Sequence, residues 1–434
     1  MTAAGRRASL RASRVGHRPA RVSAPPRCWR SVAALVAAIL LLRGAIGIAA
    51  TPVPALRVGT TGDYPPFSFR DGQGELSGFD ITVARRLAED LGRPVEFVAL
   101  RWPELVMQVE GGTVALVMSG VTVRPDRALR IAFTRPYILS GAVVVLRAAE
   151  RRKYARLQDL DRPTVRLAVN AGGHLEQVAR QRFVRARLIP VSDNRSLPDL
   201  LRQGEVDAVL SEQYEASAWP ANDFVTLGPL TRDRKAYALA LGARGLARQV
   251  NDWLAAREAD GWLNQQRRRW LGARAVMGVS QSACEAMVAA IDLRLQLMPF
   301  VAAVKRRDGL PIDDPAQEAR VLDQVRAAAA AERLNPDDVA ELFRAQMDVA
   351  KAVQRTAPLE PLPSTLSLAQ VREAVAVVSD RVLAELSRFQ PWAHTPAQRA
   401  QLDGALRRGL TVQRVPASMR DRLGRAVLRV RPAR

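Results

Sequence analysis

The sequence changes character near residue 275, and this change limits the folds that the chain can adopt. From 55 to about 272, amphipathic stretches alternate with short apolar or β-branched runs, at 56–60, 94–100, 114–119, 141–146, 164–169, 207–211 and 235–241. In 79–92, Ala84, Leu87, Ala88 and Leu91 recur at helical spacing before a stop at Gly92. Such alternation predicts an α/β fold in which helices cover sheets.

No strand pattern follows residue 280. Residues 280–309 are expected to form one long helix, with an apolar stripe that includes Val288, Ile291 and Val304. Asp314 and Pro315 then suit the N-cap and first position of another helix, and three more amphipathic segments follow. We therefore expect an all-α bundle after the α/β domain, with a boundary at 272–278. A chain of 434 residues is long enough for two such cores.

The first 50 residues predict an export signal. They contain nine arginines and no acid, and the segment 31–42 is continuously apolar. That run is too short for a bilayer span, which needs about 20 residues. Small residues follow it at 44–50. The pattern is typical of a signal peptide over 1–50, so we expect a periplasmic or secreted protein with no membrane span after cleavage. An uncleaved anchor is the alternative.

The remaining composition narrows the classes of ligand. The net charge is +22, and beyond the N-terminal segment the arginines are scattered singly. This favours anionic small molecules, and the absence of a basic stripe with aromatic residues argues against a nucleic-acid partner. After the signal, the chain keeps Cys284, His174 and His394. An internal disulfide is then impossible, and we expect no zinc site and no cofactor.

Lysine is rare in this chain. Of 65 basic residues only four are lysines, at 153, 235, 305 and 351. Lysine offers a compact ammonium, whereas arginine offers a planar fork. Lys305 lies on a predicted helix just before "LPIDD". It is therefore a candidate for a site built around a single atom, although chance placement on the surface is the alternative.

The segments "VGTTGDYPPFSF", "GFDITVARRLAEDLG" and "MSGVTVRPDRALRIAFTRPY" resemble the periplasmic solute-binding proteins of the polar amino-acid family. The resemblance covers nearly all of 55–272. It implies two lobes that close about a hinge on a ligand. Ser119, Thr122 and Arg127 follow a strand end, where hydroxyl groups and a bidentate guanidinium suit a carboxylate.

Four further segments look like an enzymatic subset of that family, the cyclohexadienyl dehydratases. They are "RWPEL" with Trp102, "VNAGGHLEQVAR" with Asn170 and Gly173, "LSEQYEAS" with Glu215, and "RKAYAL" with Lys235. These enzymes convert prephenate to phenylpyruvate, or arogenate to phenylalanine. The resemblance implies that Glu215 is the general acid and that Lys235 binds a carboxylate or tunes Glu215.

The chemistry requires such an acid. Prephenate loses CO2 and its ring hydroxyl together, and hydroxide leaves poorly until it is protonated, so a carboxylic acid must be kept neutral by burial. Three residues depart from the family pattern: His174 stands where a small hydroxyl residue is usual, Glu212 where Asp is usual, and Ala115 where Asp is common ahead of a strand. A plain receptor would need an acid for a ligand ammonium group, and Glu212 has that place in the sequence. A receptor therefore remains an alternative.

The segment "SQSACEAMVAAIDLRLQLMPFVAAVKRRDGLPIDDPAQEARVL" resembles the secreted gamma subclass of the all-helical chorismate mutases, over 278–430. Arg294 and Lys305 are 11 residues apart, close to three helical turns, so they should share a face. The resemblance implies that Arg294 binds a substrate carboxylate and that Lys305 binds the ether oxygen. It also implies binding roles for Gln354 at the ether oxygen and Arg381 at a second carboxylate.

Other residues match the mutase pattern less completely. Asp314 matches an acid at a helix start, and Lys351 lies three residues before Gln354. Gln317 stands where the mutases have Arg, and Ala350 replaces a Ser or Thr. The rearrangement needs no acid, base or nucleophile, because it is catalysed by conformer selection and by fixed charges near the breaking C–O bond.

The two resemblances reinforce each other, because the product of a mutase is the substrate of a dehydratase. We expect an exported bifunctional enzyme that takes chorismate through prephenate to phenylpyruvate, with arogenate as a possible further substrate. The alternatives are a receptor for an amino acid or aromatic acid fused to a mutase, and a non-catalytic sensor.

Overall fold

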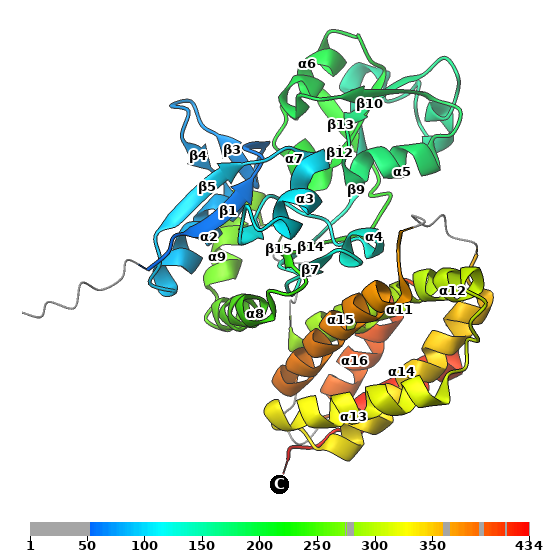
Figure 1. Cartoon of the computed structure of the whole chain (residues 1–434). Helices are drawn as coiled ribbons and strands as arrows, with labels where there is room; N and C mark the ends of the chain where they lie inside the picture. The colour runs from blue at the N-terminus through cyan, green and yellow to red at the C-terminus, as the bar shows by residue number, and fades with distance from the viewer. Residues whose placement is uncertain are drawn as a thin grey trace, which may run out of the picture. The chain divides into compact units, whose positions relative to one another are not determined.

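A computed structural model describes residues 53–273, 275, 282–358, 365–389, 395–412 and 415–433 (Figure 1). The predicted signal over 1–50 lies outside these residues. Within them the chain has the predicted order, an α/β part followed by helices alone.

The first lobe of the α/β part is built on a five-stranded sheet in the order β5-β1-β6-β15-β7. Its first three strands are parallel, and β15 runs antiparallel to both of its neighbours. The strands are β1 (Leu56–Thr60), β5 (Val95–Ala99), β6 (Leu116–Val117), β7 (Ile131–Phe133) and β15 (Ala238–Ala240). A small antiparallel sheet joins β2 (Asp63–Tyr64), β3 (Ser68–Arg70) and β4 (Leu76–Ser77).

The helices of this lobe bury their apolar sides against it. They are α2 (Phe79–Asp90), α3 (Leu105–Glu110), α4 (Pro125–Ala128), α8 (Arg244–Ala259) and α9 (Trp262–Leu271). In α2, Phe79, Val83 and Leu87 are fully buried at helical spacing and pack in one core with Leu56 and Val58 of β1.

The second lobe has its own five-stranded sheet, in the order β11-β10-β12-β9-β13. The strands are β9 (Ala142–Arg147), β10 (Arg166–Asn170), β11 (Arg187–Val191), β12 (Ala208–Glu212) and β13 (Phe224–Leu227). Helices α5 (His174–Arg182), α6 (Leu197–Arg202) and α7 (Gln213–Ser217) follow the three parallel strands. Polar side chains at these strand ends are thereby brought to one edge of the sheet.

Two short strands connect the lobes. The chain leaves the first lobe through β8 (Ile138–Ser140) and returns through β14 (Asp233–Lys235), and these strands pair antiparallel. Lys235 closes the pairing opposite Ile138. The predicted two-lobed α/β architecture is confirmed, and Lys235 lies on a strand that links the lobes.

The helical part contains α11 (Ala283–Gln296), α12 (Met298–Arg307), α13 (Pro315–Ala331), α14 (Pro336–Thr356), α15 (Leu368–Phe389), α16 (Pro396–Gly409) and α17 (Ala417–Arg429). Helix α11 packs on α15 and α16, α13 packs on α14, and α14 packs on α17. In Figure 1 these helices run from yellow-green to red. The predicted all-α bundle is confirmed.

The stretch predicted as one long helix is interrupted at Leu297, which separates α11 from α12. Pro299 explains the break, because its ring cannot donate to Leu295 and clashes with the preceding turn. The stretch Ala283–Arg307 is apolar and long enough to cross a membrane, but 83% of its most apolar window is buried inside the molecule. Its composition is therefore accounted for by the bundle core.

Candidate active sites

The α/β part encloses a cavity of about 30 Å³ between its lobes. Seven of the residues predicted for the site line it together: Trp102, Thr122, Arg127, Asn170, Gly173, Glu215 and Lys235. Tyr64, Gly120, His174, Leu175 and Asn194 complete the lining. Residues from both lobes and from the linking strand β14 thus meet at one small, enclosed space.

Glu215 lies in the first turn of α7, four residues after Ser211 of β12. Glu215 is only 2% exposed, and its carboxyl group accepts hydrogen bonds from the Ser211 hydroxyl, at 2.7 Å, and from the Asn194 amide. Burial raises the pKa of Glu215 to about 7, although both hydrogen bonds lower it. A carboxyl group in this position can be protonated near neutral pH.

Two fixed cations face the same cavity. Lys235 is 3% exposed, and its Nζ donates to Thr122 Oγ1 at 2.9 Å. Arg127 is 7% exposed, and its Nη1 has no hydrogen-bond partner within the described part of the chain. Burial, reinforced by the charge of Arg124, lowers the pKa of Arg127 to about 10, so the guanidinium is still charged at neutral pH. An anionic ligand would satisfy both groups.

Ser119 is the exception among the predicted residues of this site. It is fully buried and does not line the cavity. Its hydroxyl instead contacts the hydroxyls of Thr61, at 2.9 Å, and Ser68, at 2.7 Å. The structure thus places Ser119 outside the lining, where it links the loop after β1 to the start of β3, and its role in ligand binding stays a prediction.

Two of the residues that depart from the family pattern, Glu212 and His174, differ in position. Glu212 caps α7, and its Oε2 accepts the backbone N–H groups of Tyr214 and Glu215 at 3.0 and 3.1 Å. It does not line the cavity. His174 does line it, and its Nε2 lies 3.0 Å from a carboxylate oxygen of Asp233.

A second cavity, of about 440 Å³, lies in the helical part. It brings together five of the predicted residues: Arg294, Lys305, Asp314, Lys351 and Gln354. Apolar side chains from α12, α13 and α15, including Val301, Val321 and Leu383, form much of its remaining wall. The predicted common face of Arg294 and Lys305 is preserved across the break at Leu297.

Arg294 and Lys305 supply charge to this cavity. Arg294 is 4% exposed, its Nε donates to the Ser379 hydroxyl at 3.2 Å, and its Nη1 has no hydrogen-bond partner among the described residues. Burial lowers its pKa to about 10. Lys305 Nζ donates to the Ile312 carbonyl at 2.9 Å, and burial also lowers its pKa. Neither cation has an ion-pair partner among the described residues.

Of the other predicted residues of this cavity, two already interact with protein groups and one has a polar atom without a partner in the described part of the chain. Lys351 contacts Glu318 at 3.2 Å, and Asp314 caps α13 by accepting from Gln317 N–H at 3.0 Å. Gln354 is 7% exposed, and its Oε1 has no hydrogen-bond partner within the described residues. Gln354 is thus a polar group available to a ligand.

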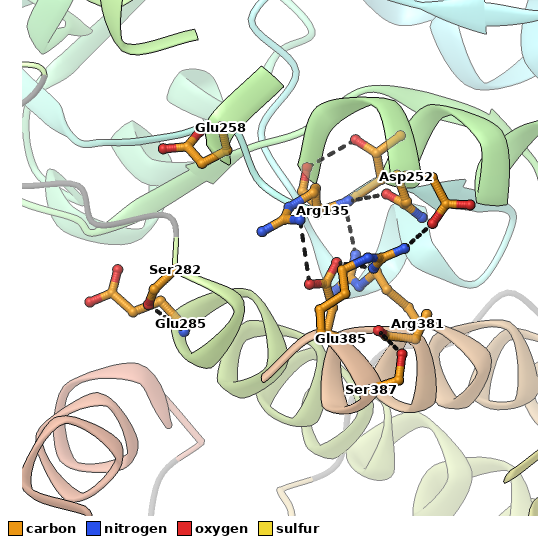
Figure 2. Close-up of polar contacts among 12 residues, drawn as sticks. Arg135, Asp252, Glu258, Ser282, Glu285, Arg381, Glu385 and Ser387 are labelled. Carbon is orange, nitrogen blue, oxygen red and sulfur yellow. Dashed lines mark hydrogen bonds and ion pairs between the residues drawn. The ribbon is translucent and has the colours of Figure 1, made fainter. Parts of the chain in front are cut away.

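Arg381 does not line the helical cavity, so its predicted role at a substrate carboxylate is not supported. Its Nη1 donates to the carbonyls of Phe133 and Thr134 in the α/β part, at 3.1 and 2.9 Å. Figure 2 shows it beside Glu385, which pairs with Arg135 at 3.6 Å. The cause is helical geometry: Arg381 lies two residues after Ser379 and therefore on a different side of α15.

Several polar residues of these sites were not predicted, and three of them are Arg372, Ser379 and Asn194. Arg372 and Ser379, at the cavity-facing side of α15, line the helical cavity. Asn194 contacts Glu215 from the loop after β11. Asn194 could have been found, because it follows a parallel strand at the edge where ligands bind in such sheets. Arg372 looks in sequence like any other surface arginine.

Comparison with known proteins identifies both parts. The family model for bacterial extracellular solute-binding proteins, family 3, matches residues 56–273, and the model for chorismate mutase type II matches residues 285–355. The cyclohexadienyl dehydratase of Pseudomonas aeruginosa is 31% identical over 227 residues, which cover 50% of this chain and 82% of that protein. Both resemblances expected from the sequence are confirmed.

Two binding proteins are also similar. The L-cystine-binding protein TcyJ of Escherichia coli is 29% identical over 222 residues, covering 50% of this chain and 83% of that protein. The other is an ancestral amino acid-binding protein, described as a precursor of cyclohexadienyl dehydratase, whose crystal structure is known. Its sequence is 30% identical, the match covers 54% of this chain and 99% of that chain, and the TM-score is 0.49. The chain belongs to the bacterial extracellular solute-binding proteins, family 3, and its helical part carries a match to the type II chorismate mutases.

Proposed function

We propose that this chain is an exported bifunctional enzyme of phenylalanine biosynthesis. The helical part rearranges chorismate to prephenate, and the α/β part converts prephenate to phenylpyruvate. The membership of a family of extracellular binding proteins and the basic, then apolar, N-terminal sequence support the periplasmic location.

The observation that carries the dehydratase proposal is the place of Glu215. It is a buried carboxyl group with a pKa of about 7, in a cavity whose other charged residues are cationic. Arg127 and Lys235 would bind the carboxylates of prephenate. Glu215 would then donate its proton to the ring hydroxyl, which leaves as water while the ring carboxylate leaves as CO2. The electrons of the broken C–C bond complete the aromatic ring of phenylpyruvate.

The mutase proposal is supported by Arg294 and Lys305, which line one partly apolar cavity and form no ion pair within the described part of the chain. Chorismate carries two carboxylates, and negative charge grows on its ether oxygen as the C–O bond breaks. Arg294 would hold a carboxylate, while Lys305 and the Gln354 amide would stabilise the ether oxygen. The enclosing walls would favour the compact conformer from which the rearrangement proceeds.

Incubating the purified chain with chorismate, and following prephenate and phenylpyruvate separately, tests both proposals. Formation of both in sequence is expected. Accumulation of prephenate without phenylpyruvate would leave the α/β part as a binding domain fused to a mutase. A chain that consumed neither chorismate nor prephenate would contradict both proposals.

A further inference from the structure

The hydroxyl group that leaves in the proposed dehydration needs two hydrogen-bond partners. Glu215 supplies a proton to its oxygen, while Arg127 and Lys235 bind carboxylates. The hydroxyl also has a hydrogen of its own, which needs an acceptor when the group is buried. As the oxygen takes up a proton it becomes more positive, and its own O–H becomes a stronger donor. An acceptor at this place therefore stabilises the transition state more than the bound substrate.

Two side chains of the described part of the chain contact the carboxyl group of Glu215, those of Ser211 and Asn194. Ser211 is fully buried and does not line the interlobe cavity. Asn194 is 4% exposed and does line it. The Asn194 Oδ1 is a buried acceptor with no hydrogen-bond partner among the described residues. Because buried polar atoms are nearly always paired, this oxygen is a candidate for binding a ligand.

The neighbours of Asn194 determine which end of its amide is left for a ligand. Its Nδ2 donates to Glu215 Oε1 and also to the backbone carbonyl oxygen of Asp63, at 3.4 Å. A carbonyl oxygen can only accept a hydrogen bond, so the NH2 end of the amide must face Asp63. The oxygen end of the amide is therefore the one without a protein partner, and it can accept from an O–H group.

Asn194 also links the two lobes. It begins the short helix η4 (Asn194–Ser196) of the second lobe, whereas Asp63 lies in β2 of the first lobe, and β2 and η4 are in contact. The hydrogen bond to the Asp63 carbonyl crosses between the lobes, so it forms only when they are closed. Closure on a ligand thus fixes the orientation of the amide beside the acid.

Other unpaired acceptors lie near the cavity. The buried Oε1 of Glu212, the buried Oδ1 of Asp63 and both ring nitrogens of His174 have no hydrogen-bond partner among the described residues. His174 lines the cavity, and the two acids do not. The charge of Asp63 helps to raise the pKa of Glu215, so Asp63 is the rival acceptor that an experiment must separate. Asn194 differs from all three, because its amide is hydrogen-bonded to the Glu215 carboxyl group itself.

We propose that Asn194 Oδ1 accepts the hydrogen of the ring hydroxyl while protonated Glu215 donates to the oxygen of the same group. Asn194 then touches the leaving group and is a catalytic residue of the α/β site. The C–O bond breaks with its electron pair on the oxygen, which leaves as water, and the electrons of the bond to the departing CO2 complete the aromatic ring. The Asn194 N–H on Glu215 Oε1 stabilises the carboxylate that remains.

This inference rests on the proposed dehydratase function and defines the ligand of that site more closely. The site takes a cyclic carboxylate that carries an alcohol group across the ring, and Asn194 recognises the alcohol. The aromatic product has no hydroxyl group, so the Asn194 oxygen loses its partner when the reaction is complete. The product is therefore bound less well than the substrate at this contact.

Two inert ligands test the contact without any turnover. Cis-4-hydroxycyclohexanecarboxylate and cyclohexanecarboxylate differ by one hydroxyl group across the ring from the carboxylate. Calorimetry uses the full chain with Arg294→Met, so that the helical cavity lacks its carboxylate anchor. Asn194→Leu should lower the affinity for the hydroxy acid by about three- to tenfold, the usual effect of one hydrogen bond, and that for the plain acid by less than about twofold.

The proposal is overturned if the site with Asn194 intact shows no preference for the hydroxy acid, or if the substitution affects both ligands equally. Asn264→Leu is the control, because Asn264 bonds to Arg267 at 2.7 Å and does not line the cavity. It should leave the preference unchanged. Thermal unfolding checks that each variant is folded, and Asn194→Ala replaces Asn194→Leu if the larger side chain prevents folding.

A further variant tests the rival acceptor. Asp63→Asn should keep the preference for the hydroxy acid, because the amide of Asn194 is untouched. Loss of the preference in Asp63→Asn together with its retention in Asn194→Leu would assign the hydroxyl to Asp63 and contradict the proposal.

Turnover separates this inference from the dehydratase function. With prephenate, Asn194→Leu should lower kcat by about tenfold or more, because the contact strengthens in the transition state, while chorismate consumption stays normal. An unchanged kcat would contradict the catalytic role of Asn194. If the unaltered chain does not convert prephenate, the dehydratase function fails, and calorimetry still decides whether Asn194 binds a hydroxyl group.

Discussion

Lys305 Nζ and the carbonyl oxygen of Ile312 lie 2.9 Å apart, so the loop that follows α12 holds the ammonium group at the wall of the helical cavity. One hydrogen of the ammonium is used, and the other two have no partner among the residues that the structure describes, so they can bind a ligand. A positioned point charge of this kind is what a breaking C–O bond requires.

Replacing Lys305 by Ala should therefore lower kcat/KM for chorismate by about 10² to 10³, the usual effect of removing one donor to a developing oxyanion. Lys153→Ala is the control, because Lys153 is 59% exposed and pairs with Glu150 far along the chain from this cavity. Initial rates of chorismate loss would measure both. Similar small effects would mean that Lys305 is an ordinary surface charge.

Glu215→Gln should reduce dehydratase kcat by about 10² to 10⁴, because an amide cannot supply the proton. Its shape keeps the contacts to Ser211 and Asn194, so phenylpyruvate binding should persist in calorimetry. Chorismate consumption by the same sample reports on folding. A variant that still formed phenylpyruvate at the normal rate would exclude Glu215 as the acid.

Dehydratase kcat/KM should fall as the pH rises through about 7, because burial raises the pKa of Glu215 from 4.5 to about 7 and only the protonated form can donate. The same shift links to stability. A raised folded-state pKa contributes stability that is present below pH 4.5 and is lost as the pH rises through about 7. Thermal unfolding between pH 5 and 8 should therefore lose more stability in the wild type than in Glu215→Gln. Parallel losses would show that Glu215 titrates normally.

Arg294→Met and Arg381→Met should separate the two arginines. Arg294 faces the cavity without an acidic partner, so its loss should lower kcat/KM for chorismate by about 10² with little loss of stability. Arg381 donates to two buried carbonyls, so its loss should cost about 1 to 3 kcal/mol of stability and leave the KM for chorismate nearly unchanged. Kinetics and thermal unfolding of both variants decide this. The reverse pattern would restore Arg381 to the binding site.

The architecture and most of both sites could be predicted from the sequence, for identifiable reasons. The strand at 207–211 was predictable because strand patterns are local in sequence. The common face of Arg294 and Lys305 was predictable because their 11-residue spacing depends only on helical periodicity. Ser119 and Arg381 could not be placed, because their direction depends on long-range neighbours. Ser119 meets Thr61 and Ser68, and Arg381 meets carbonyls almost 250 positions away.

Helix α15 presents Arg372 and Ser379 to the helical cavity, and Arg381 and Glu385 to groups of the α/β part. A fragment that begins near residue 280 would leave the Arg381 guanidinium without its two carbonyl acceptors and would take Arg135 away from Glu385, which would keep only Arg388 of its own helix. Expressing the helical part alone to study its activity would thus disturb the site that it carries. Single substitutions that inactivate one site in the intact chain are therefore a better way to measure what each activity contributes.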